Sequence, residues 1–156
     1  SGPEPDLEND AMTVIIDPID GTAMFSMHLP EWCVSVGVFR VYTPVYGFVY
    51  SPGFDMLFYN DDSNAYLNGR PLRADRNIRV DNETNIFSAS EVSNRFIVDF
   101  PGKIRNLGST ALHACLAADN ARHRTLAFIG KSNLWDWAGA VPIVHKAGCM
   151  VRYING

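Results

Sequence analysis

Val-Ile-Ile-Asp-Pro-Ile-Asp-Gly-Thr, residues 14–22, is the stretch around which the chain is organised. Its three branched apolar residues predict a short buried strand. Pro18 has no N–H to donate, so we expect it to end the strand's hydrogen bonding and to leave Asp17 at the strand's end. Gly21 and Thr22 then let the chain turn into a weakly amphipathic segment. The stretch therefore predicts a strand, an elbow that carries two carboxylates, and a helix start.

The elbow offers the oxygen ligands that hard divalent cations prefer. Asp17 and Asp20 are close in sequence, the Ile19 carbonyl could add a third oxygen, and N–H groups at a helix start can hold an anion. Asp-Pro and Asp-Gly are also ordinary turn dipeptides, and an Asp-x-x-Asp elbow taken alone is more often a turn than a metal site. A divalent metal with phosphate is the chemistry suggested, with a plain turn as the alternative.

Composition limits the classes of protein that the chain can be. Its 156 residues are 47% hydrophobic and 19% charged, which is ordinary for one globular domain over residues 1–156. No apolar run approaches the roughly 20 residues of a membrane span and no signal-like segment opens the chain, so we expect a soluble, cytoplasmic protein without a membrane partner. The net charge of −4 argues against nucleic acid as a partner. A small anionic substrate would need metal ions or local cationic side chains.

The cysteines and histidines do not form a metal-binding pattern. Cys33, Cys115 and Cys149 lie among apolar neighbours with no Cys-x-x-Cys pair, which predicts reduced thiols in the core. The four histidines show neither His-x-His nor His-x-x-x-His spacing, which argues against zinc. Any metal that the chain binds should therefore prefer oxygen ligands.

The first part of the chain, to about residue 90, predicts a mainly antiparallel sheet. Strand-like runs separated by turn residues occur at residues 32–40, 45–50, 56–59, 65–67 and 85–90, and the first four predict a meander. After the meander, an arginine recurs every third residue, at Arg70, Arg73, Arg76 and Arg79. This spacing could form a phosphate-binding stripe, but Pro71 and the mixed charges around it favour a solvated, irregular segment.

The second part, from about residue 105, alternates helical and strand patterns and predicts an α/β arrangement. Capping hydroxyls and helical spacing predict a helix over residues 107–118, and residues 125–129 and 149–153 predict strands. Ser132 and Asn133 can cap a last helix that begins near Leu134.

Two details of this part have competing interpretations. Pro142 falls inside the expected last helix, where an interior proline costs about 3 kcal/mol unless the helix kinks or restarts, and we expect a kink. Arg122-His123-Arg124 predicts a solvated basic loop, with an anion contact as the alternative.

A second motif changes the interpretation of the elbow. Asp136 lies between two tryptophans in residues 134–140, Leu-Trp-Asp-Trp-Ala-Gly-Ala, and His-Lys-Ala-Gly follows at residues 145–148. Alone, Asp136 is an acid in the first turn of a helix, where it complements the macrodipole. After Asp-Pro-Ile-Asp-Gly-Thr and in this order, however, the motif resembles the second half of the signature of the inositol monophosphatase family of magnesium-dependent, lithium-sensitive phosphatases. Segments 67–69 and 108–111 also resemble family segments, so the resemblance spans essentially all of the chain.

The resemblance implies the family's layered α-β-α-β-α sandwich, a mixed α/β fold that would be incomplete in this chain, and a homodimer. It also implies two or three Mg²⁺ ions. Asp17 would bridge two ions, the Ile19 carbonyl would complete the shell of the first, and Asp20 and Asp136 would hold the second. The remaining site residues implied are Thr22, which would orient the attacking water, the Gly21 and Thr22 amides for phosphate, and Gly108, Ser109 and Thr110 on the side of the substrate alcohol.

The activity implied is hydrolysis of a small phosphorylated alcohol, such as an inositol phosphate or a related sugar or polyol phosphate, by a water that two metals activate. Fructose-1,6-bisphosphatase, histidinol-phosphate phosphatase and 3′,5′-bisphosphate nucleotidase of the same superfamily stay open. Ile129 stands about where inositol-selective members carry an acid, which puts inositol phosphate itself in doubt.

The chain also departs from the family pattern at its beginning. The family places a Glu-Glu pair just before this region, and no such pair occurs here. We therefore expect a fragment without the family's N-terminal helices and C-terminal end, with an incomplete first metal site and no activity of its own. A catalytically inactive binding or assembly module is the alternative from another class.

Overall fold

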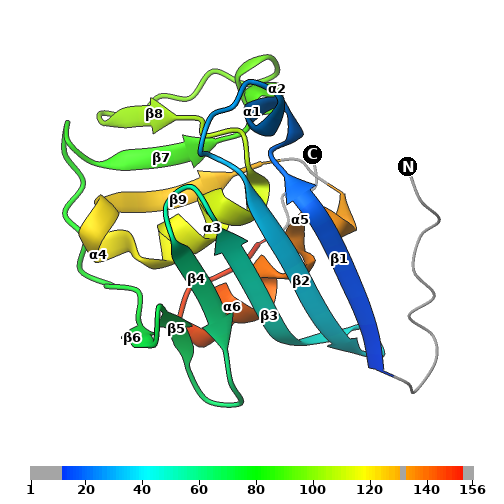
Figure 1. Ribbon diagram of the computed structural model, residues 1–156. Coiled ribbons are helices and arrows are strands. Elements are labelled where there is room, and N and C mark those ends of the chain that lie inside the picture. Colours follow the sequence, from blue (N-terminus) through cyan, green and yellow to red (C-terminus); the bar gives the residue numbers. More distant parts are fainter. Residues whose placement is uncertain (1–11, 131–132, 153–156) are drawn as a thin grey trace.

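The computed structural model describes residues 12–130 and 133–152, and Figure 1 shows two β-sheets with helices between them. The larger sheet is antiparallel, with its six strands in chain order: β1 (Met12–Asp20), β2 (Cys33–Arg40), β3 (Thr43–Ser51), β4 (Met56–Asn60), β5 (Ala65–Leu67) and β6 (Arg70–Leu72). The smaller sheet is parallel, with the strand order β8 (Lys103–Arg105), β7 (Asn85–Ser88) and β9 (Thr125–Ile129). The antiparallel sheet ends at Leu72, and β7, which lies before residue 90, already belongs to the parallel sheet.

Six helices accompany these strands in the described residues. They are α1 (Thr22–Ser26), α2 (Ser90–Ser93), α3 (Thr110–Ala118), α4 (Asn120–His123), α5 (Leu134–Ala138) and α6 (Ala140–Lys146). The core lies where α3 and α6 pack between the two sheets. Leu112 of α3 and Ile143 of α6 are fully buried in one cluster with Phe58 of the larger sheet and Phe87 of the smaller one. The layers present are thus sheet, helices and sheet, a mixed α/β fold.

Strand β1 exists as expected, but its burial and its end differ from expectation. Of the three branched residues, only Ile15 is buried, while Val14 and Ile16 are 55% and 58% exposed, because side chains alternate between the two faces of a sheet. The strand also continues past Pro18. Its pairing with β2 shifts register between Asp17 and Asp20 and then resumes, and an edge strand tolerates such an irregular proline. Pro18 therefore interrupts the ladder without ending the strand.

The meander has more strands than expected. Hairpins join β2 through β6, and α1 lies in the connection between β1 and β2. The sheet therefore gains β1 at one edge and β6, inside the segment expected to be irregular, at the other. Asn68 and Gly69, with φ of 49° and 77°, make the expected tight turn between β5 and β6. The short elements α2 and β8 were not expected.

The second part contains three corrections. The expected last helix is two helices, α5 and α6, which meet at Gly139. Pro142 is the third residue of α6, where its missing N–H has no intrahelical partner, so the helix restarts instead of kinking around it. Residues 122–124 are not a plain loop, because α4 runs through His123. Residues 149–152 form no strand, and the rest of that expected strand, like the Ser132 cap, lies outside the described residues.

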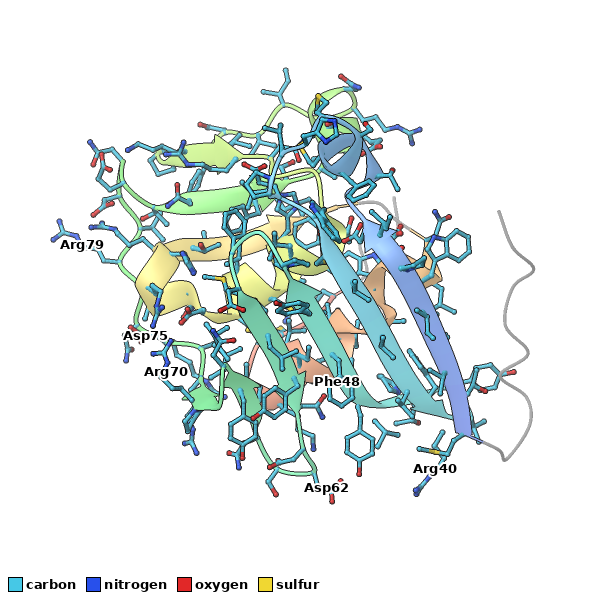
Figure 2. The ribbon with its side chains drawn as sticks, viewed as in Figure 1. Arg40, Phe48, Asp62, Arg70, Asp75 and Arg79 are labelled. Carbon is cyan, nitrogen blue, oxygen red and sulfur yellow. The ribbon has the colours of Figure 1, made fainter. Side chains whose placement is uncertain are left out.

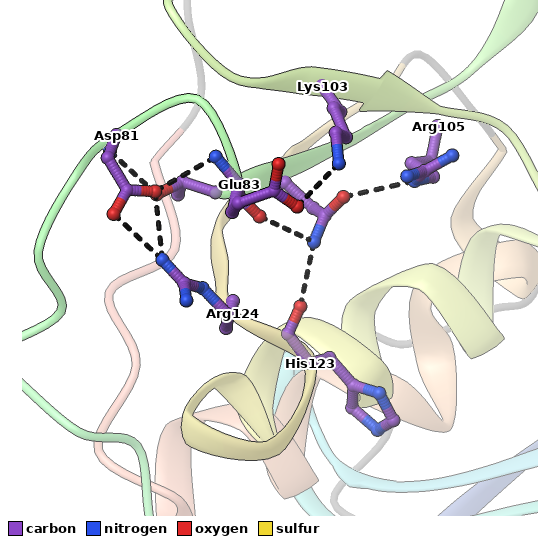
Figure 3. A network of polar contacts seen from close by, with 8 residues as sticks. Asp81, Glu83, Lys103, Arg105, His123 and Arg124 are labelled. Atoms are coloured by element: carbon purple, nitrogen blue, oxygen red, sulfur yellow. Dashed lines mark hydrogen bonds and ion pairs between the residues drawn. The ribbon is translucent and has the colours of Figure 1, made fainter.

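Polar contacts fasten one end of the smaller sheet (Figure 3). Arg124, in the left-handed conformation just after α4, donates two hydrogen bonds of 2.8 Å to Asp81. The Asn85 amide of β7 receives a hydrogen bond from Arg105 of β8 and donates one to the His123 carbonyl. Because Arg124 is already paired in this structural network, the anion-contact reading of the basic segment gains no support.

The outer face of the larger sheet is rich in exposed apolar side chains. Besides Val14 and Ile16, it presents Phe48, Tyr50 and Leu57, which are 44%, 39% and 36% exposed, and Figure 2 labels Phe48 on this face. All three cysteines are free thiols, with Cys33 and Cys115 buried and Cys149 partly exposed. Among the described residues, no helix has the length and apolar character needed to cross a bilayer.

Candidate metal and phosphate site

Three aspartates from two distant segments meet at one end of the larger sheet. Asp17 and Asp20 come from the end of β1, and Asp136 comes from the first turn of α5, more than a hundred residues later. Each can offer a carboxylate oxygen such that the three oxygens lie within 4.8 Å of one another. The structure thus brings together the three acids that the two sequence motifs singled out.

Asp20 is buried and held by α3. Its Oδ2 accepts hydrogen bonds from Ser109 Oγ at 2.6 Å and from the Ala111 N–H at 2.7 Å, and the Cys33 thiol lies 3.9 Å away. Ser109 Oγ in turn accepts the Leu112 N–H at 3.2 Å and so caps α3. Since these donors occupy Oδ2, Oδ1 is the oxygen that Asp20 can offer to a ligand.

Asp17 and Asp136 are half-buried and oriented by local backbone. The Ile19 N–H donates to Asp17 Oδ1 at 3.1 Å across the elbow. The Asn133 N–H donates to Asp136 Oδ2 at 2.8 Å, which confirms that Asp136 reaches back to the residue that caps α5. Both carboxylates therefore keep an oxygen free of these bonds.

Two strand glycines let the helical segment with Asp136 approach the sheet. A Cβ atom at Gly37 of β2 would lie 2.3 Å from the Ala138 carbonyl oxygen, and one at Gly47 of β3 would lie 1.9 Å from that of Gly139. Both distances are far inside van der Waals contact. The end of α5 therefore packs directly on the backbone of β2 and β3, and this contact sets the position of Asp136 relative to β1.

A cavity of about 250 Å³ opens beside the triad. Asp20 and Asp136 line it, together with polar side chains from α2, from α3 and the residues just before it, and from the N-cap of α5: Glu91, Asn106, Thr110, His113 and Asn133. Glu91 comes from α2, a helix that the sequence analysis did not predict, so this acid in the wall was missed. Asn106 and His113 carry no motif that could have marked them, because only the packing of α3 against the smaller sheet brings them to the cavity.

Only some of the other predicted site residues line this cavity. Gly108 and Thr110 line it, whereas Ser109 is fully buried and engaged with Asp20. Thr22 is exposed at the start of α1. Gly21 has φ +90°, and a Cβ there would lie 3.0 Å from the Glu31 carbonyl oxygen, so only glycine fits this turn without strain.

Burial makes the three carboxylates unfavourable as bare anions. Desolvation raises the pKa of Asp20 to about 6, although hydrogen bonds from Ser109 and Ala111 oppose the shift. Desolvation likewise raises the pKa of Asp136. It also raises the pKa of Asp17, and the negative charge of Asp136 raises that pKa further. A divalent cation would neutralise this cluster, and an all-oxygen donor set suits Mg²⁺. The residues present therefore fit magnesium.

Comparison with known proteins agrees with this arrangement. The chain matches the model of the inositol monophosphatase family over residues 1–156. It is 34% identical over 151 residues to inositol monophosphatase 1 of Solanum lycopersicum, covering 89% of this chain and 55% of the tomato protein. It is 31% identical to a fructose-1,6-bisphosphatase/inositol-1-monophosphatase of Thermotoga maritima, over 91% of this chain and 57% of that protein.

Solved structures agree as well. The crystal structure of the extragenic suppressor protein suhB of Bartonella henselae superposes with a TM-score of 0.74 at 29% identity, over 90% of this chain and 60% of that one. The Thermotoga maritima IMPase gives the same TM-score at 30% identity, over 90% of this chain and 56% of that one. The chain spans a little over half the length of these relatives. Its sequence over all 156 residues, its fold and its aspartate triad together show that the chain belongs to the inositol monophosphatase family.

Proposed function

We propose that the whole protein is a Mg²⁺-dependent phosphomonoesterase that hydrolyses a small phosphorylated alcohol. The observation that carries the proposal is the convergence of Asp17, Asp20 and Asp136 within 4.8 Å beside a polar cavity. A binding or assembly module would have no need to hold three mutually repelling acids together beside one cavity. The family's phosphatases supply the chemical class.

The side chains divide the work between metal and substrate. Asp17, Asp20 and Asp136 would hold two or three Mg²⁺ ions with help from the Ile19 carbonyl. Bound magnesium would lower the pKa of a water and stabilise the charge that develops on the leaving oxygen. Thr22 would orient the water that attacks phosphorus. The Gly21 and Thr22 amides would contact phosphate oxygens, and Gly108, Ser109 and Thr110 would form the substrate side, with Ser109 acting through Asp20.

The hydrogen-bonding side chains that line the cavity favour an alcohol with many hydroxyl groups as the leaving group. Glu91 offers a carboxylate acceptor, and Asn106 and Asn133 add amides that both donate and accept hydrogen bonds. Sugar and polyol phosphates have many hydroxyls to match them. Fructose 1,6-bisphosphate is the second candidate substrate, because relatives from Thermotoga maritima and Aquifex aeolicus are named for both activities. Ile129, which brings no acid to β9, favours a substrate other than inositol phosphate.

The test is phosphate release by the full-length protein from inositol 1-phosphate, fructose 1,6-bisphosphate, histidinol phosphate and 3′,5′-bisphosphate nucleotides. We expect release that requires Mg²⁺ and falls when lithium is added. Asp17→Asn and Asp136→Asn should abolish turnover with the fold intact, while Asp81→Asn, a carboxylate in the network of Figure 3, serves as the matched control. Near-normal turnover in either triad variant would contradict the proposal.

Residues 1–156 alone should bind metal weakly and release no phosphate, because the family's upstream acids are missing from them. Absence of release by the full-length protein from every compound, with Mg²⁺ present, would favour the inactive binding module instead. A homodimer and a cytoplasmic location stay predictions, to be checked by light scattering and by cell fractionation.

A further inference from the structure

A second cavity, of about 420 Å³, shares no lining residue with the cavity beside the triad. Three segments form it: the turn between β4 and β5, the chain just after β6, and the C-terminal end of α6. Its charged side chains are Arg73, Arg76 and Lys146, and no acidic residue lines it. We call it the basic cavity.

The three cations have no ion-pair partner within the described residues. Lys146 Nζ donates to the Asp62 carbonyl oxygen at 2.6 Å, and Arg73 Nη2 reaches Asn64 Oδ1 at only 3.5 Å. Both acceptors are neutral, so neither contact is an ion pair. Such a concentration of unpaired cations is unexpected in a chain of net charge −4.

Two carboxylates close in sequence to the lining residues already accept hydrogen bonds from other donors. Asp61, whose pKa is lowered mainly by backbone N–H groups of the same turn and slightly by Lys146, accepts hydrogen bonds from Ser63, Asn64 and Tyr66. Asp75 lies between the two arginines in sequence, but its Oδ1 accepts the Asn77 N–H. Neither carboxylate forms an ion pair with the basic cavity.

The segment that carries the arginines is fixed and not a free loop. The Ala74 N–H donates to the Ala147 carbonyl oxygen at 2.8 Å, which ties the segment to the end of α6. The buried Asn120 side chain bonds both backbone groups of Asp75, accepting from its N–H at 2.7 Å and donating to its carbonyl at 2.8 Å. Arg73 and Arg76 therefore leave a rigid backbone at set positions, which lowers the entropy cost of binding.

We propose that the basic cavity is a second anion site, which binds a small soluble molecule carrying phosphate groups. Guanidinium groups pair with phosphate oxygens two at a time, and a lysine adds a third charge. The volume leaves room for more than one phosphate group. Of the four evenly spaced arginines, Arg73 and Arg76 line the basic cavity, whereas Arg70 and Arg79 line neither of the two cavities described and lie exposed at the molecule's edge in Figure 2.

The test is calorimetric titration of the full-length protein with pyrophosphate and with inorganic phosphate, in EDTA so that the triad holds no metal. We expect saturable binding that weakens with salt and is tighter for pyrophosphate. Arg73→Gln with Lys146→Gln should weaken it by about tenfold or more, since each removes a charge-assisted contact. Arg70→Gln with Arg79→Gln removes the same net charge outside the cavity and should leave affinity within about twofold.

Two further variants test whether the double variant has unfolded and whether the anion binds at the aspartate triad instead. Arg76→Gln alone should also weaken binding, which keeps the test valid if the double variant unfolds. Asp17→Asn with Asp136→Asn should leave binding unchanged, and loss of binding there would place the anion at the triad and overturn the proposal. The proposal would also be overturned if pyrophosphate showed no saturable binding. The same holds if Arg70→Gln with Arg79→Gln lowered the affinity as much as Arg73→Gln with Lys146→Gln. Since this titration excludes metal, its outcome is independent of whether the protein is a phosphatase.

Discussion

Ser109 shows how a residue can serve a site without lining it. Its hydroxyl is fully buried, donates to Asp20 Oδ2 and accepts the N–H of Leu112. The sequence placed Ser109 on the substrate side, and the geometry gives it a positioning role for Asp20. The residue thus couples the start of α3 to the elbow of β1.

We expect Ser109→Ala to weaken metal binding, because Asp20 would lose the donor that fixes its carboxylate. The lost cap should also lower the free energy of unfolding by about 1 kcal/mol. Titration of Mn²⁺ into the full-length protein measures the first effect, and Ser109→Thr, which keeps the hydroxyl, is the control. If Ser109 instead contacted substrate directly, KM would rise with Mn²⁺ affinity unchanged.

His113 is a second buried residue with a testable consequence. Its ring lies between Phe87 and Phe128, with centroids 5.2 Å from each, and its Nε2 accepts the Leu107 N–H, which leaves the proton of the neutral ring on Nδ1. Desolvation lowers the pKa of His113 from 6.5 to about 4. Between these values the unfolded chain takes up a proton that the folded protein does not.

The free energy of unfolding should therefore be unaffected by His113 above pH 6.5 and should fall as the pH drops from 6.5 to 4. The shift corresponds to a loss of about 3 kcal/mol at the acidic end. His113→Gln, whose carbonyl can still accept the Leu107 N–H, should remove this part of the slope. Urea unfolding of both proteins across this pH range measures the difference, and identical slopes would show that His113 titrates normally.

At the scale of elements, the contact of α5 with β2 and β3 decides whether the triad forms. Asp136 belongs to a helix of five residues, too short to be stable by itself, so its position comes from packing. The C-terminal end of α5 and the beginning of α6 pack against the backbone at Gly37 and Gly47. The sequence showed Gly37 only as a small residue between valines.

Gly37→Ala should push α5 away from the sheet, because its new Cβ would overlap the Ala138 carbonyl. We expect loss of most metal binding and a lower melting temperature, by the few degrees that about 1–3 kcal/mol of overpacking produces. Val38→Ala, next along the strand and with its side chain on the opposite face, should cost stability but leave Mn²⁺ affinity near the wild-type value. Wild-type Mn²⁺ affinity in Gly37→Ala would mean that α5 does not set the site.

At the scale of the whole molecule, one face of the protein is exposed and apolar. The outer side of the larger sheet carries apolar side chains from β1, β3 and β4, including a stack in which the ring centroids of Phe48 and Tyr59 lie 6.4 Å apart and those of Tyr59 and Tyr66 lie 5.1 Å apart. Exposed apolar patches of this kind mark interfaces or association sites.

Residues 1–156 expressed alone should therefore self-associate and bind an apolar dye such as ANS. Ile16→Lys with Phe48→Lys should reduce both effects, whereas Leu126→Lys, at an equally exposed apolar side chain on β9, should not. Light scattering against concentration measures association. A monomer that binds no dye would contradict the prediction.

The sequence alone indicated the class of chemistry and predicted most of the elements. Local signals sufficed where the cause was local: a glycine at an elbow, Asn-Gly at a hairpin, a serine that caps α3, and an acid in the first turn of α5. Family resemblance then joined Asp17 and Asp20 to Asp136 and indicated the fold and the class of activity.

Tertiary structure decided what depends on contacts between distant segments. Which face of β1 is buried follows from where the helices pack, and the position of β1 at the edge of the sheet allows the strand to pass Pro18. The restart at Gly139 depends on the bare backbone of two other strands, and no local pattern reveals it. The sequence specifies which groups can bind a metal or an anion, but only the fold brings their atoms together, because hydrogen bonds and packing act over a few ångströms of space and not along the chain.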